Sequence, residues 1–217
     1  SKDLDVGCGP GSFLELLGKR HKNSSLIGVD IDASQIEFAS KRIGAQFENK
    51  RVRFELINDP NSSLPFNDGE FDVVTCIEVI EHLLPYSAMR LLSEIRRVLT
   101  PRGLFLLTTP NYQSLWPLIE MGLNRLSQVS YEEQHINKFT PVSLCKFVEG
   151  AGFNLGKLNS IFLVAPFLSP ISWRFAQLVH RFECLHDRFG SLLIMESNPC
   201  PSECAPPISP ENIKVSA

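Results

Sequence analysis

Three glycines at alternate positions, Gly7, Gly9 and Gly11, constrain this chain more than any other stretch of its sequence. A short run that includes Asp5 leads into them, and residues 12–17 then read as a helix. Glycines let a strand turn sharply into a helix and let a ligand approach the backbone. The free N–H groups at the start of the helix favour negative charge. We therefore predict a strand–loop–helix unit whose loop holds an anionic small molecule.

The spacing of the glycines argues against a dinucleotide site. The dinucleotide pattern G-x-G-x-x-G/A needs glycine or alanine at position 12. Ser12 stands there, and the third glycine comes one residue early, at Gly11. The pattern Asp5-x-Gly7-x-Gly9-x-Gly11 instead resembles the first motif of class I S-adenosylmethionine-dependent methyltransferases, in which this loop cradles the methionyl end of the cofactor. A tight turn that binds nothing is the alternative.

Asp30 ends the next apolar run, 26–29, and a helix is predicted over 33–46. Gly11 and Asp30 are separated by one strand–helix–strand unit, as in nucleotide-binding folds. The two oxygens of one carboxylate can accept hydrogen bonds from both hydroxyls of a ribose. Asp30 could otherwise cap the helix, although Asp32 or Ser34 could fill that role. We predict that Asp30 binds the cofactor ribose.

Composition indicates one ordinary globular domain. The chain has 217 residues, 43% of them hydrophobic and 21% charged, which is enough for a sizeable core. Its net charge of −3 argues against a dedicated nucleic-acid-binding protein. The basic clusters at 19–22 and 50–53 are interpreted as solvated turns.

Six cysteines without C-x-x-C spacing suggest free thiols and a reducing compartment. There is no apolar run of about 18 residues that would predict a transmembrane helix. We therefore expect a cytoplasmic protein, with peripheral membrane contact as an option. The chain begins at Ser1 with a short first strand, so we expect that its natural N-terminus is truncated.

Strands and helices alternate along the chain, which predicts a parallel α/β sheet. The predicted strands are 2–6, 26–30, 52–57, 71–77, 104–109, 158–164 and 191–197, and the predicted helices are 12–17, 33–46, 86–99 and 141–149. As in the family that the glycine loop resembles, the fold class is α/β: a Rossmann-like, doubly wound, seven-stranded and mostly parallel sheet with an antiparallel last strand.

Two further segments resemble the methyltransferase family. The fourth strand runs into Glu78-Val79-Ile80-Glu81-His82, similar to its E-V-x-E-H sequence, and the fifth runs into T-P-N at 109–111. The combined resemblance covers about residues 3–164, and the chain is similar to methyltransferases of types 11 and 23 and to ubiquinone-pathway O-methyltransferases. It implies S-adenosylmethionine as cofactor. The cofactor-binding residues that it implies are Asp5, Gly7, Cys8, Gly9, Gly11, Asp30, Ile31, Asp59, Cys76 and Ile77.

Asp59 follows the third strand, where the family commonly places an acid on the adenine amino group. The loop after it is one residue longer than usual. Asn58 is a substitute, and an Asx-turn is the structural alternative.

Two insertions, 112–140 and 165–190, carry many large apolar residues, and we predict that they cap the acceptor site within a methyltransferase domain over 1–197. A helix packed on the sheet is the alternative for the second insertion. Residues 198–217 hold five prolines and are predicted to form a disordered tail.

Transfer of a methyl group to a hydroxyl or an amine also removes a proton, so a base or a metal is useful. The catalytic candidates are His82, His135 and Glu81. A divalent metal is the less favoured option, with the candidate ligands Glu78, Glu81, His82 and His135.

The sequence leads to three hypotheses for the function. The first is a methyltransferase that acts on a small-molecule or lipid-linked acceptor at oxygen. The second is a 2′-O-methyltransferase of RNA 3′-ends, which share the E-x-x-E-H sequence and a later histidine, although the absence of a basic face argues against nucleic acid. The third is a cofactor-binding protein without catalysis.

Overall fold

A computed structural model describes residues 1–43, 46–47, 51–59, 62–114, 116–117, 135–161, 172, 174, 177–179 and 190–200. Its elements in chain order are β1 (Lys2–Val6), α1 (Ser12–Arg20), β2 (Ser25–Asp30), α2 (Ala33–Ile43), β3 (Val52–Leu56), β4 (Phe71–Ile77), the 3-10 helix η3 (Ile80–His82), α3 (Pro85–Val98), β5 (Leu99–Pro110), α6 (Pro141–Gly150), β6 (Phe153–Ile161) and β7 (Leu192–Pro199). Across these residues no helix is both long and apolar enough to cross a membrane.

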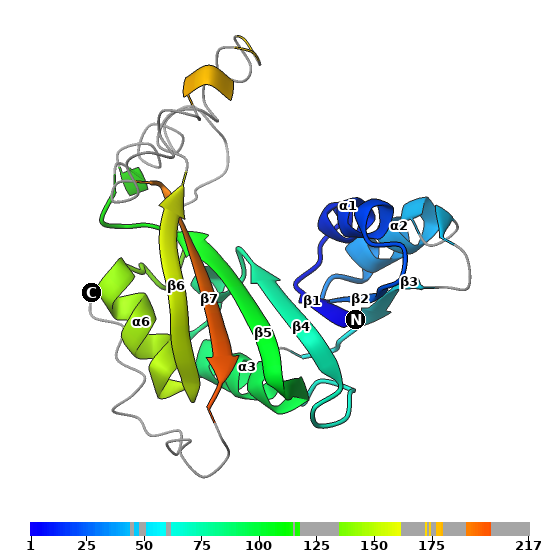
Figure 1. Cartoon of the computed structure of the whole chain (residues 1–217), viewed down its shortest axis with the longest axis horizontal. Helices are drawn as coiled ribbons and strands as arrows, with labels where there is room; N and C mark the ends of the chain where they lie inside the picture. The colour runs from blue at the N-terminus through cyan, green and yellow to red at the C-terminus, as the bar shows by residue number, and fades with distance from the viewer. Residues whose placement is uncertain are drawn as a thin grey trace.

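The seven strands form one sheet in the order β3-β2-β1-β4-β5-β7-β6 (Figure 1). Strands β1 to β5 pair in parallel, whereas β7 is antiparallel to both of its neighbours, β5 and β6. The predicted fold class is therefore confirmed. The strand order reverses between β1 and β4, and ligands of open parallel sheets bind at such a switch point, beyond the carboxyl ends of the strands.

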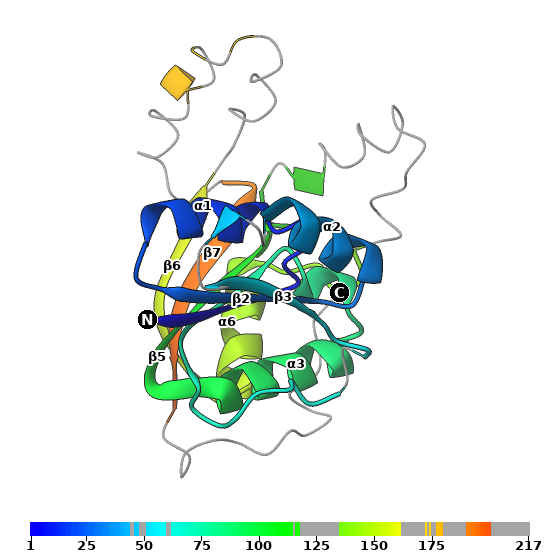
Figure 2. The same ribbon diagram turned by 90° about the vertical axis from the view of Figure 1, so that its right-hand side faces the viewer.

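Helices cover the two faces of the sheet unequally. Helices α1 and α2 lie on one face over β1, β2 and β3, and α3 and α6 lie on the other (Figure 2). The main apolar core fills the α3–α6 side, where Phe105, Leu107, Leu193 and Met195 are buried. A second, smaller cluster lies under α1 and α2. Strands of a parallel sheet are buried in this way because helical crossovers cover them.

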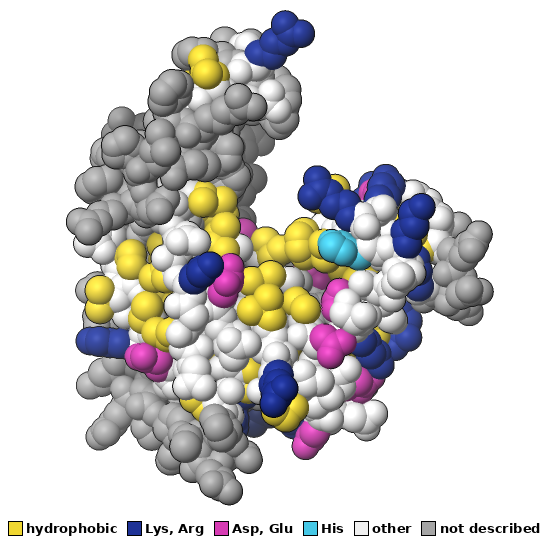
Figure 3. All heavy atoms as spheres, in the orientation of Figure 1, with side chains coloured by type: hydrophobic (Ala, Val, Ile, Leu, Met, Phe, Trp, Pro, Cys, Tyr) yellow, Lys and Arg dark blue, Asp and Glu magenta, His cyan; other side chains and the backbone are white. Residues whose placement is uncertain are grey.

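The opposite face of β4, β5 and β7 carries half-buried apolar side chains. Leu104 and Leu106 of β5 alternate with the buried core residues, and Ile194 extends the same face in β7. Apolar atoms are visible across the hollow between this part of the sheet and α1–α2 (Figure 3). Most of the predicted caps, 112–140 and 165–190, lies outside the described residues, so their role stays a prediction.

Strand boundaries differ from the prediction where the backbone is irregular. β6 begins at Phe153, five residues before the predicted start at 158, because residues 153–155 also pair with β7. The register shifts between Leu155 and Leu158, around the exposed pair Gly156-Lys157. β5 begins at Leu99, which pairs with Phe71 of β4, and continues through 101–103, which read as a turn. These residues form a bulge, since the next paired residue of β5 is Leu104, opposite Val73. β7 continues to Pro199, two residues beyond the predicted domain boundary at 197.

The glycines of the first loop serve different purposes. All three have positive φ angles, of 76° for Gly7, 50° for Gly9 and 75° for Gly11. A Cβ atom at Gly11 would lie 2.7 Å from the ring of Phe54 and 2.8 Å from Ile43, whereas a Cβ at Gly9 would meet no atom within 4 Å. Gly11 is therefore needed for packing against α2 and β3, and Gly9 borders open space.

Asp5 is buried beside β4. The register pairs Asp5 with Thr75, and the Thr75 hydroxyl donates a hydrogen bond of 2.6 Å to Oδ1 of Asp5. Burial raises the pKa of Asp5 to about 6, against the lowering effect of that hydrogen bond, and the charge of Asp30 adds to the increase. The acid is thus held at a site that disfavours its charged form.

We predict that Gly11→Ala destabilises the protein far more than Gly9→Ala. Both alanines would adopt a left-handed backbone, which costs about 1–2 kcal/mol. Only the alanine at position 11 would also collide with Phe54 and Ile43, adding about 1–3 kcal/mol of overpacking. Urea denaturation of the two variants measures the difference. Equal losses of unfolding free energy would contradict the assignment of Gly11 to packing.

We predict that Asp5→Asn removes a pH-dependent cost of folding. Because the folded pKa of Asp5 is raised, the folded state binds more protons than the unfolded state between about pH 4 and pH 6, and stability falls as pH rises through this range. The unfolding free energy of Asp5→Asn relative to the parent should therefore increase by up to roughly 3 kcal/mol from pH 4 to pH 7.5. Urea denaturation across this range tests it.

Asp32 supplies a control in which stability changes with pH in the opposite direction. Its Oδ1 accepts hydrogen bonds from the Ser34 hydroxyl and backbone N–H, which lower its pKa. The stability that Asp32 contributes is present above its unfolded pKa and is lost as pH falls through its folded pKa. Asp32→Asn should therefore lose stability relative to the parent as pH rises. The same slope in both variants would refute the Asp5 prediction.

Candidate functional site

A cavity of about 230 Å³ opens at the carboxyl ends of β1, β2, β3 and β4. It is lined by Val6, Gly7, Asp30, Ile31, Ile57, Glu78, Val79, His82, Leu83 and Leu91. The cavity combines apolar walls with a few polar groups, as small-molecule sites do. It lies at the switch point between β1 and β4, where the fold places a ligand.

Asp30 lies in the cavity wall and holds the glycine loop. Its Oδ2 accepts a hydrogen bond of 2.8 Å from the Gly9 N–H, and its Oδ1 accepts one of 2.9 Å from the Asp32 N–H. Asp32, not Asp30, caps α2, since its Oδ1 accepts from the N–H groups of Ser34 and Gln35. Each carboxylate oxygen of Asp30 keeps a second lone pair for a ligand hydroxyl.

Three of the predicted cofactor residues line the cavity: Gly7, Asp30 and Ile31. Ile31 projects from the sheet edge and is 56% exposed. The others do not line the cavity. Gly9 donates its N–H to Asp30, Gly11 packs against α2, and Asp5, Asp59 and Ile77 lie outside the lining.

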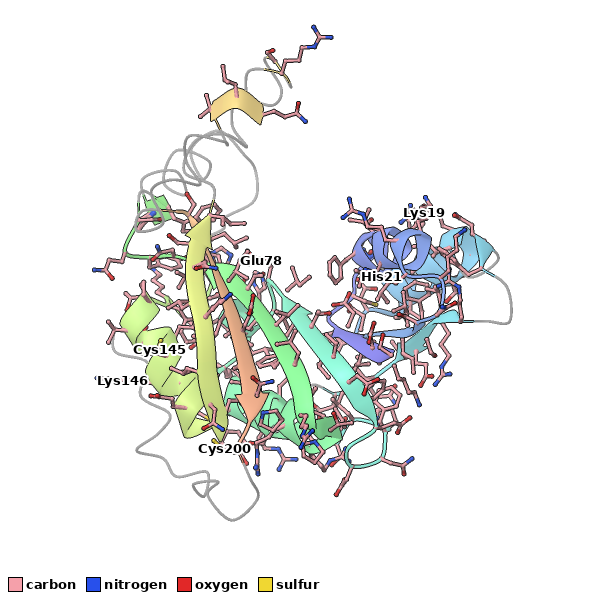
Figure 4. All side chains as sticks on the ribbon, viewed as in Figure 1. Lys19, His21, Glu78, Cys145, Lys146 and Cys200 are labelled. Atoms are coloured by element: carbon pink, nitrogen blue, oxygen red, sulfur yellow. The ribbon has the colours of Figure 1, made fainter. Side chains whose placement is uncertain are left out.

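The two predicted cysteines point away from the cavity. A Cβ built on Gly28 would lie 2.8 Å from Sγ of Cys8, so this thiol packs on β2, and Cys76 is fully buried in the main core. Burial raises the pKa of both thiols, which makes them inert. Cys145 lies on α6 and Cys200 just beyond β7, both far from Glu78 (Figure 4). These four described cysteines are free.

Several wall residues were missed from the sequence as ligand contacts: Val6, Ile57, Val79, Leu83 and Leu91. They are apolar and read as ordinary core positions, so pattern alone could not distinguish them. For Val79 the only hint is structural: Gly7, in the loop after β1, packs directly against its side chain. A Cβ at Gly7 would lie only 2.3 Å from Cγ2 of Val79, so the loops after β1 and β4 touch.

Glu78 occupies a conformation that costs free energy. It is the one non-glycine residue in the described chain with a positive φ, of 54°. Its Oε1 accepts a hydrogen bond of 2.9 Å from the Thr108 hydroxyl at the end of β5. Figure 4 shows Glu78 at the upper end of β4, beside that of β5. Such strain concentrates at functional sites.

Glu81 is a fully buried carboxyl group behind the cavity. Its Oε2 accepts a hydrogen bond of 3.2 Å from the Thr109 hydroxyl, while Oε1 is buried without a hydrogen-bond partner. Burial, and the nearby charge of Glu78, raise the pKa of Glu81 well above its usual value. Its Oε1 lies 3.9 Å from Nε2 of His82.

His135 returns from a distant part of the chain to complete this group. Its ring centroid lies 5.0 Å from that of His82, and one ligand atom each from Glu81, His82 and His135 fall within 4.8 Å of one another. Asn137 fixes the returning loop, since its side chain donates to the carbonyls of Ile80 and Leu83. The three predicted catalytic residues therefore meet. Glu78, the fourth predicted metal ligand, does not belong to this group.

Comparison with known proteins finds relatives that are described as methyltransferases. A protein of Mycolicibacterium smegmatis described as a probable S-adenosylmethionine-dependent methyltransferase is 28% identical over 159 residues, which are 73% of this chain and 54% of that protein. The ubiquinone biosynthesis O-methyltransferase of Pasteurella multocida is 25% identical over 183 residues, 80% of this chain and 72% of that enzyme. The chain spans about half the length of the first curated relatives that it matches.

Among solved structures, the PH0226 protein of Pyrococcus horikoshii superposes with a TM-score of 0.64 at 22% identity, over 91% of this chain and 81% of that one. This likeness shows the shared fold. The family model for the methyltransferase domain matches residues 2–158, which contain the glycine loop, the cavity and all three meeting side chains. The chain therefore belongs to the class I S-adenosylmethionine-dependent methyltransferase family.

Proposed function

We propose that this protein transfers a methyl group from S-adenosylmethionine to an oxygen of a small-molecule or lipid-linked acceptor. One observation carries the proposal: the ligand cavity at the switch point borders the group formed by Glu81, His82 and His135, through the shared wall residue His82. The cavity suits the cofactor, and the histidines suit removal of a proton from the acceptor.

The residues of the cavity fit the cofactor in their chemistry. Asp30 offers acceptors for ribose hydroxyls, and Ile31, Ile57 and Leu83 offer an apolar surface for the adenine. Gly9 presents its backbone beside open space, where a side chain would meet an incoming ligand. Bound there, the cofactor supplies an electrophilic methyl group on a positively charged sulfur.

The protein has two tasks in such a reaction. It must hold the acceptor in line with the methyl group, which can supply most of the acceleration through effective molarity. It must also take up the proton of a hydroxyl acceptor, and His135 and His82 are the bases present. The names of two relatives, a malonyl-[acyl-carrier protein] O-methyltransferase and the ubiquinone biosynthesis O-methyltransferase, favour oxygen as the acceptor atom.

A divalent metal is the second candidate for this task. The buried, unpartnered Oε1 of Glu81 and the ring nitrogens of His82 and His135 form a donor set that suits such an ion. The ion would lower the pKa of an acceptor hydroxyl. Its ligands would be these three residues. Glu78 would not be a ligand, because its carboxylate accepts a hydrogen bond from Thr108 instead.

We predict that Asp30→Ala weakens binding of S-adenosylmethionine at least about tenfold, because hydrogen bonds to a charged acceptor contribute roughly 1.5–3 kcal/mol each. Isothermal titration calorimetry measures the affinity. Asp32→Ala is the matched control: it removes the cap of α2, which should lower stability, and it should leave affinity unchanged. Parent-like affinity in Asp30→Ala would refute the ribose role.

We predict transfer of radiolabelled methyl groups into a lipid or small-molecule extract and not into an RNA pool. His135→Ala should reduce turnover by about 10²-fold or more, the usual contribution of a positioned base. Turnover that persists in EDTA would favour the histidine base. Turnover lost in EDTA and restored by Mg²⁺, Mn²⁺ or Co²⁺ would favour the metal. If label enters neither pool although the cofactor binds, the protein is a cofactor-binding protein and the proposed function fails.

A further inference from the structure

The end of α2 reaches the glycine loop through one guanidinium group. Helices α1 and α2 lie side by side on the same face of the sheet (Figure 2). Arg42 lies in the last turn of α2, and its Nη2 donates hydrogen bonds of 3.1 Å to the Pro10 carbonyl and 3.3 Å to Oγ of Ser12. Its Nη1 donates one of 2.8 Å to Oε2 of Glu15. One side chain thus bonds both the loop and the first turn of α1.

The tip of the loop is a tight turn that is also held from β2. The Gly11 N–H donates a hydrogen bond of 3.0 Å to the Cys8 carbonyl, which closes the turn. The Gly9 N–H donates one of 2.8 Å to Oδ2 of Asp30, the last residue of β2. Since Arg42 belongs to the helix that follows, the β2–α2 unit holds the loop at two points.

Hydrogen bonds matter at this tip because packing does not hold it. A Cβ at Gly9 would meet no atom within 4 Å, so the middle of the turn borders open space. Glycine also has more conformational freedom to lose than any other residue. A ligand that binds a loosely held loop must order it, whereas a loop that is already ordered binds more tightly.

The acceptors around Arg42 suit an arginine and not a lysine. They are a carbonyl, a hydroxyl and a carboxylate, contributed by the loop and by α1. A guanidinium group has five donors in a rigid planar fork, whereas an ammonium group is a compact point charge on a flexible stem. The guanidinium group also lies over the ring of Phe38, 5.4 Å from its centroid, and this contact supports its orientation.

We propose that Arg42 is a positioning residue that keeps the glycine loop in its cofactor-binding conformation before the cofactor arrives. The inference rests on the proposed function and deepens it. Arg42 itself touches no cofactor in this assignment and acts through the backbone of the loop. Without its fork the loop leaves this conformation for part of the time, and the apparent Kd rises as the competent fraction falls.

The test compares Arg42→Gln with Lys41→Gln. Each variant removes one positive charge from the last turn of α2, but Lys41 forms its ion pair with Glu37 of the same helix. Isothermal titration calorimetry measures the Kd for S-adenosylmethionine without any acceptor. We expect the Kd to rise roughly 3–10-fold in Arg42→Gln, about the effect of one lost hydrogen bond, and to stay unchanged in Lys41→Gln. Arg42→Lys keeps the charge but not the fork, so its Kd should rise as well.

Hydrogen exchange in the cofactor-free protein supplies a second readout, which is independent of activity. The amides of Gly9 and Gly11 are hydrogen-bonded and should be protected in the parent. In Arg42→Gln we expect faster exchange in peptides that cover residues 7–12, with the strands of the sheet unchanged. Saturating S-adenosylmethionine should restore the protection. A residue that served only to stabilise the fold would change exchange across the domain and leave the Kd unchanged.

Several outcomes would overturn the inference: a parent-like Kd in either Arg42 variant, an equal rise of the Kd in Lys41→Gln, or unchanged exchange at the loop. A lower melting temperature with an unchanged Kd would also overturn it, because Arg42 would then stabilise the fold alone. A parent that does not bind S-adenosylmethionine would instead overturn the proposed function. Exchange in the cofactor-free protein would still decide whether Arg42 orders the loop.

Discussion

The site depends on one close contact between two loops. Gly7, after β1, lies against Val79, after β4, and the contact exists only because position 7 has no side chain: a Cβ there would lie 2.3 Å from the valine. The parallel pairing of β1 with β4 brings the two loops together, with Val6 opposite Cys76. The glycine loop and the segment that carries Glu78, Glu81 and His82 are therefore packed on one another as a unit.

The polar groups around this contact are held at a cost in stability. Asp5 and Glu81 are buried carboxyl groups with raised pKa values, and Glu78 has a left-handed backbone. Each feature is compensated locally by a threonine hydroxyl: Thr75 bonds Asp5, Thr108 bonds Glu78 and Thr109 bonds Glu81. Two of these threonines end β5, so this strand supports the acidic segment from the side opposite β1. Buried polar groups retained at such cost are typical of functional sites.

The two halves of the sheet supply different kinds of side chain to the site. The first half, β1 to β3 with α1 and α2, supplies the glycine loop, Asp30 and Ile31, which are suited to a nucleoside. The second half supplies Glu81, His82 and His135, which are suited to proton transfer. Helix α3 and the main core support the second half from the opposite face. Cofactor and acceptor would thus meet at the line where the strand order reverses.

The fold class, the glycine loop, the acid at the end of β2 and the candidate group of Glu81, His82 and His135 could all be predicted from the sequence. These features are local, since strand periodicity, glycine spacing and an acid after an apolar run depend on neighbours in the chain. The folded structure was needed to show which of the three glycines is required for packing, that Asp32 rather than Asp30 caps α2, and that Cys8 points into the core. It also separated Glu78 from the histidines and brought the Arg42 side chain to the Pro10 carbonyl across 32 positions of the chain. These outcomes depend on contacts between segments distant in sequence, and no local pattern encodes such contacts.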